Sequence, residues 1–419
     1  MKHFHLAALV CCNIVAAAAQ STGVYVGGHI RRERPATIST LKHSGFTYVI
    51  LFNVNVEPDG TLTTDGETIC RDGEYVFADT QPNYMADVTS LKDWPTSIER
   101  IEICIGGWGN ESYQRIKDLI AKEGFGSGSM LYRNFKALKD ALPVIDAVNN
   151  DDEHCYDVSS AVRFHVMMSQ LGYHTTVAPY TNRTFWQDLV TQLNQSRPGA
   201  CDRVLIQCYD GGAYNNPADW HFGDIPLHAG RTNYQTDMAT SVSQMQTWRD
   251  EAAVTGGFVW VYNDETWNLN QWASAMNRVF PAKNADESVA TFYSDNNFGG
   301  YDVALPVGVY SKGELAACGI TDRDIQSFRL TPGYTLTTYT TDDLTGTSKL
   351  WTDVEMARMG AWGNRISSLK IEKSEDVEGI LSPSFHSSPF TLRQSPTSLH
   401  GRPATGKGIQ IVKGRKVIK

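Results

Sequence analysis

The chain has 419 residues, of which 41% are hydrophobic and 20% are charged, and its formal net charge is −9. This composition is typical of a folded globular protein, and the length is enough for an α/β barrel of about 250 residues together with a smaller domain. The negative charge argues against non-specific binding to nucleic acid.

Residues 1–19 have the features of a secretory signal. Lys2 supplies the positive start, an apolar run follows, and Ala17–Ala19 provide small residues for cleavage. The run is too short for a membrane-spanning helix, so we expect a secreted or cell-surface protein without a transmembrane segment. Six cysteines follow this signal, and none forms a CxxC pair, which argues against zinc. Export permits disulfides, but their pairing cannot be predicted from the sequence.

Strand and helix patterns alternate over residues 20–285, which favours an α/β fold of the (β/α)8 barrel type. Helical stretches are expected at 132–142 and 160–172. Polar or aromatic residues at or just beyond the expected strand ends are candidates for binding: His29, Asn53, Asn55, Tyr180, Trp186, Asp210 and Tyr214. The eight expected strands are 23–30, 48–56, 98–109, 144–153, 174–181, 203–210, 225–230 and 256–264.

The fourth expected strand ends in a cluster of carboxylates. Because strand side chains alternate between faces, Asn149, Asp151 and Glu153 share one face. The Cα atoms of Asp151 and Glu153 are expected about 6–7 Å apart. Two carboxyl groups in a partly dry pocket do not both ionise readily, so one keeps a proton and can act as a general acid. The alternatives are a solvated polar strand end and a calcium loop.

The run from Asp146 to Glu153, DAVNNDDE, resembles the D-x-x-D-x-D-x-E signature of family 18 glycoside hydrolases. That family contains chitinases and endo-β-N-acetylglucosaminidases. Ala147 stands where the family usually has glycine, and Asn149 stands where it usually has aspartate. Asp151 and Glu153, the positions nearest the chemistry, match.

Three further stretches resemble landmarks of the same family in the expected order. The segment Cys104 to Trp108 is similar to the S-x-G-G strand, with Gly107 as its second glycine. The segment Gln207 to Asp210 is similar to the tyrosine element of the sixth strand. Trp260 is similar to the tryptophan that ends the eighth strand. Each stretch alone is more typical of a turn or of core packing.

The resemblance implies a role for each matched residue. Glu153 would protonate the glycosidic oxygen, Asp151 would orient the substrate's 2-acetamido group for attack, and Tyr209 would donate a hydrogen bond to that group. Asn149 would lie beneath Asp151, and with an amide there the tuning of the pKa of Asp151 must differ from the family pattern, so the resemblance does not fix the pH optimum. The reaction would retain the anomeric configuration and require no cofactor or metal. The remaining substrate contacts would come from the matched residues Gln207, Trp260 and Gly107, and from Tyr180 at the end of an expected strand.

Residues 288–373 are expected to form a second domain. Two stretches that open on strands ending in Tyr293 and Tyr339 form an internal repeat. The repeat resembles the βγ-crystallin double Greek key. Calcium-binding members of that family carry an N/D-N/D-x-x-S/T-S run, which is altered here at 322–327 and 363–368. We therefore expect calcium binding to be weak or absent.

Residues 374–419 are expected to form a linker and a basic tail. The last residues alternate apolar and basic side chains and predict a hairpin around Lys413 and Gly414. They are similar to the sorting segments of exported Bacteroidetes proteins. A basic disordered tail is the equal alternative.

The sequence favours a secreted hydrolase of glycans that contain N-acetylglucosamine, either N-glycans or chitin. Two other functions stay open. One is a lectin-like barrel that binds glycan without turnover, although the catalytic acid Glu153 is present. The other is a structural envelope protein whose function lies in the second domain.

Overall fold

The computed structural model describes residues 21–32, 34–263, 268–281 and 287–374, and the backbone of 411–412 and 415–416. The expected signal segment at 1–19 and the expected linker after Ser374 lie outside the described residues.

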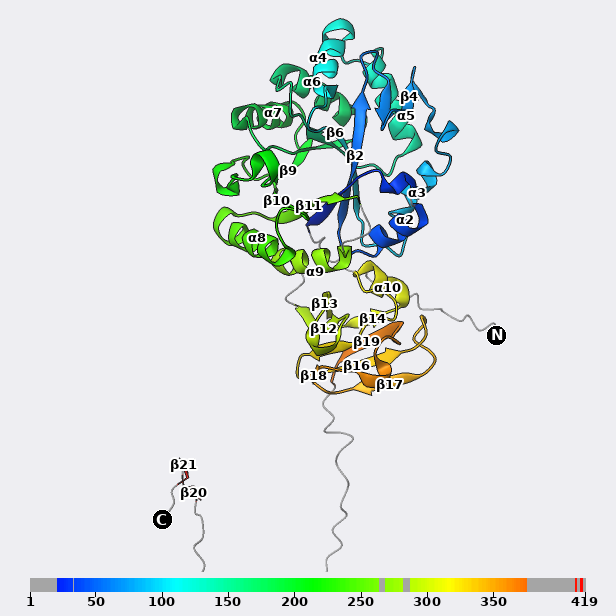
Figure 1. Cartoon of the computed structure of the whole chain (residues 1–419), viewed down its shortest axis with the longest axis vertical. Coiled ribbons are helices and arrows are strands. Elements are labelled where there is room, and N and C mark those ends of the chain that lie inside the picture. Colours follow the sequence, from blue (N-terminus) through cyan, green and yellow to red (C-terminus); the bar gives the residue numbers. More distant parts are fainter. Residues whose placement is uncertain are drawn as a thin grey trace, which may run out of the picture. The chain divides into compact units, whose positions relative to one another are not determined.

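Eight parallel strands close into a barrel (Figure 1). The order of the strands is β1-β11-β10-β9-β8-β7-β6-β2, and pairing of β1 with β2 closes the ring. The fold class expected from the sequence is confirmed to this extent. The strands are β1 (Thr22–Val26), β2 (Tyr48–Val56), β6 (Arg100–Gly106), β7 (Ala147–Asp151), β8 (His174–Val177), β9 (Cys201–Gln207), β10 (Leu227–Thr232) and β11 (Gly256–Tyr262).

Helices connect most consecutive strands and cover the outside of the barrel (Figure 1). Side-chain caps begin several of them; for example, Asp157 accepts a hydrogen bond from the Ser160 backbone at the start of α6. The helices are α1 (His29–Arg32), α2 (Arg34–Lys42), α3 (Tyr84–Ser90), α4 (Ser112–Glu123), α5 (Met130–Ala141), α6 (Val158–Gln170), α7 (Arg183–Ser196), α8 (Met238–Ala252) and α9 (Leu269–Val279).

The structure differs from the sequence prediction in several places, and some expected strands are shorter, for example 174–181, which ends at Val177. The first strand ends at Val26, and the helix α1 begins at His29, where a strand was expected to continue. Residues 208–226, all described, contain only short 3-10 turns and no α-helix between β9 and β10. Antiparallel strands that were not expected follow β2, namely β3 (Leu62–Thr64), β4 (Glu67–Arg71) and β5 (Glu74–Tyr75).

Two buried layers stabilise the barrel. The larger lies mostly between the strands and the surrounding helices and includes Phe135, Phe164 and Trp186. The smaller fills the inside of the barrel and includes Tyr25, Tyr48, Leu205, Tyr209 and Phe258. Strands that are buried on both faces explain the continuous apolar run of β2.

Residues 288–373 form two four-stranded antiparallel sheets, with strand orders β13-β12-β15-β18 and β14-β19-β16-β17. Each sheet takes three strands from one half of the internal repeat and one strand from the other half, so the halves interlock. Trp351, Phe328 and Phe292 lie in the shared core. The elements are β12 (Ser288–Tyr293), β13 (Asp302–Pro306), β14 (Gly308–Tyr310), α10 (Lys312–Ala317), β15 (Ser327–Leu330), β16 (Tyr334–Tyr339), β17 (Ser348–Trp351), β18 (Glu355–Met356) and β19 (Ser368–Lys373).

The hairpin expected in the tail is present, because β20 (Ile411–Val412) pairs antiparallel with β21 (Arg415–Lys416). Among the described residues, no helix has the length and apolar character needed to cross a membrane. The thiols of Cys70, Cys104, Cys155, Cys201, Cys208 and Cys318 are free.

Candidate active site

Asp151 is the last residue of β7 and is almost fully buried. The amide nitrogen of Gln207, at the end of β9, donates to Asp151 Oδ1 at 2.7 Å and to the Ala178 carbonyl at 2.8 Å. Burial raises the pKa of Asp151 well above its usual value, and the nearby Glu153 raises it further, whereas the bond from Gln207 opposes this rise. The carboxyl group is therefore held in one orientation in a poorly solvated place.

Glu153 lies two residues beyond β7 and is half-buried. Burial is the main cause that raises its pKa to about 7, and the charges of Asp210 and Asp152 act in the same direction. A hydrogen bond with Tyr180 lowers it. A carboxyl group with a pKa near 7 is protonated in a large fraction of molecules at neutral pH, as a general acid requires.

Tyr209 lies two residues beyond the end of β9 and is buried. Burial raises the pKa of its phenol, and the charges of Asp151 and Glu153 raise it further. Its hydroxyl is therefore a neutral hydrogen-bond donor at any ordinary pH. Tyr180 follows β8, and a hydrogen bond joins it to Glu153.

Gly106 and Gly107 allow the end of β6 to approach Asp151 closely. Their φ angles are +109° and +103°, which favour glycine. A Cβ atom on Gly106 would lie 2.1 Å from the Asp151 carbonyl oxygen, and the Gly107 amide donates to that same oxygen at 2.7 Å. Glycine is thus needed at Gly106 for packing against β7, whereas a Cβ atom on Gly107 would lie 2.9 Å from the Phe52 ring.

Asn149 is fully buried beneath Asp151 and is held from two sides. Tyr25 donates to Asn149 Oδ1 at 2.9 Å, and Asn149 Nδ2 donates to Thr176 Oγ1 at 2.8 Å. Thr176 in turn donates to Glu102 at 2.6 Å. The Thr176 hydroxyl proton is already donated to Glu102, so Thr176 can only accept a hydrogen bond from residue 149. The amide of Asn149 can donate this bond.

Trp260 lies in β11 and is half-buried within an aromatic group inside the barrel. Its ring centroid is 4.7 Å from that of Phe52 and 5.2 Å from that of Tyr25, both in edge-to-face geometry. The two rings hold the indole in place. Of the other candidates at strand ends, Asp210 accepts hydrogen bonds from Tyr234 and Gln235, and Tyr214 is fully exposed.

The opposite face of β7 is structural. Asp152 accepts hydrogen bonds from the backbone of residues 154, 155 and 156, and Asn150 contacts the buried His165. Trp186, named among the strand-end candidates, lies in α7 and is 1% exposed. It packs on Phe185 and Tyr156, so it belongs to the core.

The runs that were compared with calcium loops have other partners in the second domain. Asp322 forms an ion pair with Lys312 at 3.0 Å. The guanidinium of Arg323 donates to Ser367, and Ser368 donates to the Thr341 carbonyl. Within the described ranges, no three His, Cys, Asp or Glu side chains come together as a metal-binding group.

Tyr25, Thr176 and Glu102 surround the site but were not predicted from the sequence. Each lies in a strand, and the alternation of side chains along that strand places it inside the barrel, like Asn149. That alternation was the available signal for Tyr25 and Thr176. For Glu102 the neighbouring Arg100, two residues earlier on the same face, was a signal of a buried ion pair, which the structure shows at 2.7 Å.

The fold and the site define a closed barrel of eight parallel strands, with carboxyl groups at the C-terminal end of β7, joined to antiparallel sheets. No family model matches the chain, and no curated protein matches it. About a fifth of the chain is similar to small solved domains, several of which are βγ-crystallin domains. It is 28% identical to the N-terminal domain of protein S (20% of this chain, 97% of that chain, TM-score 0.20). It is 29% identical to a βγ-crystallin domain from Flavobacterium johnsoniae (20% of this chain, 94% of that chain, TM-score 0.20). It is 32% identical to a βγ-crystallin domain from Clostridium beijerinckii (21% of this chain, 99% of that chain, TM-score 0.19).

Proposed function

We propose that this protein is a secreted glycoside hydrolase of the family 18 type that cleaves β-1,4 linkages next to N-acetylglucosamine. The observation that carries the proposal is the pair Asp151 and Glu153, in which burial raises both pKa values and brings that of Glu153 to about 7. Gln207 and Tyr209, which the sequence placed in the same site, border this pair.

In the proposed reaction, Glu153 gives its proton to the glycosidic oxygen as the bond to the anomeric carbon breaks. The carbonyl oxygen of the substrate's own 2-acetamido group attacks that carbon from the other side. Asp151, fixed by Gln207, orients the acetamido N–H and stabilises the positive charge on the cyclic intermediate. Tyr209 donates to the acetamido oxygen. Glu153 then removes a proton from a water molecule as this water attacks the anomeric carbon. The attack opens the cyclic intermediate, and the product keeps the anomeric configuration of the substrate.

Asn149 distinguishes this site from a family member with aspartate there. Because Asn149 cannot take a proton from Asp151, the pKa of Asp151 is set by burial and by the neighbouring Glu153, Asp152 and Gln207. The reaction uses no cofactor, and the second domain, proposed to be βγ-crystallin-like, supplies no group to it.

The test is incubation of the purified chain with a high-mannose glycoprotein and, separately, with colloidal chitin, followed by mass spectrometry of the products. Release of a glycan with a single reducing-end N-acetylglucosamine identifies an endo-β-N-acetylglucosaminidase, and release of chitobiose identifies a chitinase. Glycan binding without products in both wild type and Glu153→Gln supports the lectin-like alternative. If wild type forms no products and binds no glycan, both functions are contradicted.

A further inference from the structure

A cavity of about 640 Å³ lies at the end of the barrel opposite to Asp151 and Glu153. Some of its lining comes from α2 and from the segments that lead into β2 and β6, so it is at the N-terminal edge of these strands. The second domain lines the other side with residues of α10 and neighbouring turns. Small-molecule sites commonly have volumes of about 300–1,000 Å³.

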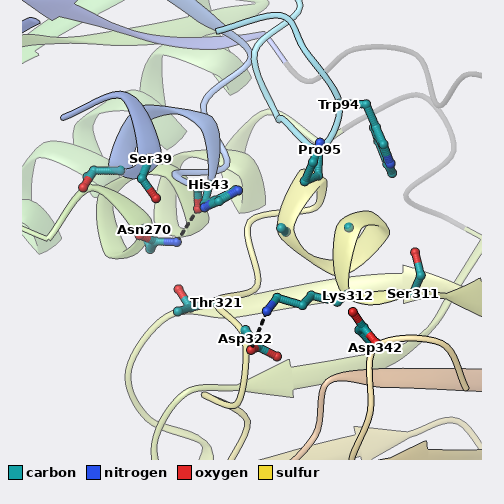
Figure 2. Close-up of a pocket in the computed structure, with 13 residues that line it drawn as sticks. Ser39, His43, Trp94, Pro95, Asn270, Ser311, Lys312, Thr321, Asp322 and Asp342 are labelled. Atoms are coloured by element: carbon teal, nitrogen blue, oxygen red, sulfur yellow. Dashed lines mark hydrogen bonds and ion pairs between the residues drawn. The ribbon is translucent and has the colours of Figure 1, made fainter. Parts of the chain in front are cut away.

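Trp94 is the main apolar surface of this cavity. Its side chain is 63% exposed, which is unusual for an indole that could pack in a core. Pro95 lies beside it, and the nearest atom to a Cβ built on Gly313 is the Trp94 indole nitrogen, at 3.2 Å. Figure 2 shows Trp94 and Pro95 on one side of the hollow and Ser39 with His43 on the other.

The remaining lining is polar but carries little net charge. Lys312 pairs with Asp322 at 3.0 Å, and Asp342 adds one further carboxylate (Figure 2). The Lys312 side chain is 51% exposed and keeps donors that Asp322 does not use. Burial and the charges of Lys42 and Lys312 lower the pKa of His43, so the imidazole is neutral at pH 7.

This balance of charge and surface selects one class of ligand. A surplus of one carboxylate disfavours phosphates and other anions. One flat aromatic face with hydroxyl, amide, ammonium and carboxylate groups around it matches a molecule that has an apolar face and a rim of hydroxyl groups. A neutral pyranose has both features.

We propose that this cavity is a saccharide-binding site, in which one or two neutral sugar rings stack on Trp94 and their hydroxyl groups bond to Ser39, Asn270, Lys312 and Asp342. The site is separate from the proposed catalytic centre and does not depend on catalysis. Since residues from both domains line it, bound sugar also bridges the barrel and the second domain.

The test uses the full-length chain with Glu153→Gln, to prevent turnover, and titrates it calorimetrically with N,N′-diacetylchitobiose, cellobiose and mannobiose. We expect Trp94→Ala in this background to weaken binding of at least one disaccharide at one site by tenfold or more. Asp342→Lys, which projects a long cationic side chain at the same place, should have a similar effect. Trp108→Ala is the matched control, because Trp108 is 75% exposed but follows β6 at the barrel's other end, and it should leave this site unchanged.

The outcomes separate the two proposals. If the proposed catalytic centre also binds sugar, the Glu153→Gln parent shows two sites and Trp94→Ala removes one of them. If the catalytic centre binds no sugar, the parent shows one site and Trp94→Ala removes it. Circular dichroism checks folding, and Asp342→Lys decides the result if Trp94→Ala does not fold. Isotherms that Trp94→Ala and Asp342→Lys leave unchanged for all three sugars, or a parent that binds none of them, overturn the inference.

Discussion

The Gln207 amide nitrogen donates to Asp151 Oδ1 at 2.7 Å, across residues that are 56 positions apart in the chain. The same nitrogen donates to the Ala178 carbonyl, so both of its hydrogens are used and the amide cannot flip without losing both bonds. This bond fixes the carboxyl group of Asp151. It lowers the pKa of Asp151, whereas burial, Glu153 and Asp152 all raise it.

Replacing Gln207 with glutamate should therefore disturb Asp151 directly. An ionised carboxylate at this place faces both Asp151 and a carbonyl oxygen, so Gln207→Glu should lower kcat/KM at pH 7 by about 10–100-fold, the value of a hydrogen bond to a charged group. Lowering the pH protonates the introduced carboxyl group and should restore part of the activity. The control Gln207→Met removes the donor without adding a titrating group and should show no such recovery. Equal pH profiles for the two variants would contradict this account.

Removing the proton of Glu153 should abolish hydrolysis. Glu153→Gln keeps the shape of the side chain but cannot donate a proton to a leaving group, so we expect kcat to fall by at least about 100-fold. For wild type, kcat/KM should decline above pH 7, about tenfold per pH unit, because the acid with a pKa of about 7 is then ionised. The rate at which reducing ends are released from substrate between pH 4 and 9 measures both the loss of kcat in the variant and the pH profile of the wild type. Glu111→Gln, an exposed carboxylate with its side chain 63% accessible, is the control.

The same substitution should stabilise the fold at alkaline pH. The pKa of Glu153 is about 7 in the folded chain and about 4.5 when unfolded. Between these values the folded state binds more protons than the unfolded state, so wild-type stability falls as pH rises from about 4.5 to 7. Glu153→Gln removes this loss, and its free energy of unfolding should exceed that of wild type at pH 8 and match it near pH 4. Urea denaturation at the two pH values measures the difference. A difference that is equal at both would show that Glu153 is not titrating in this range.

Gly106→Ala should be far more harmful than the same change at another glycine of positive φ whose surroundings are open. The added Cβ meets the Asp151 carbonyl oxygen at 2.1 Å, whereas at Gly66, with φ of +80°, it would meet nothing within 4 Å. Gly66→Ala should thus cost only the strain of positive φ, about 1–3 kcal/mol, and keep activity. Gly106→Ala should lower the free energy of unfolding further and remove activity. Similar losses for both variants would mean that the contact with β7 is unimportant.

Much of the site was predictable because strand alternation is a local property. The pattern of β7 placed Asn149 and Asp151 on one face, and the structure shows both facing the interior, with Asn150 and Asp152 in structural hydrogen bonds on the other. The apolar run of 48–56 predicted β2 at its observed bounds, since a strand that is buried on both faces has a distinctive composition. The strand expected at 23–30 was wrong beyond Val26, because His29 begins a helix whose pattern is too short to detect.

The sequence alone determined which residues alternate along each strand, where the apolar segments lie, and that two carboxyl groups follow one of them. Tertiary structure decided that Gln207 faces Asp151, that Tyr25 and Thr176 hold Asn149, that Trp186 is buried, and that the halves of the second domain exchange strands. The physical reason is that periodicity reports only the local environment of a segment. Partners far apart in the chain are brought together by closure of the barrel and by strand pairing, which depend on the packing of the whole chain.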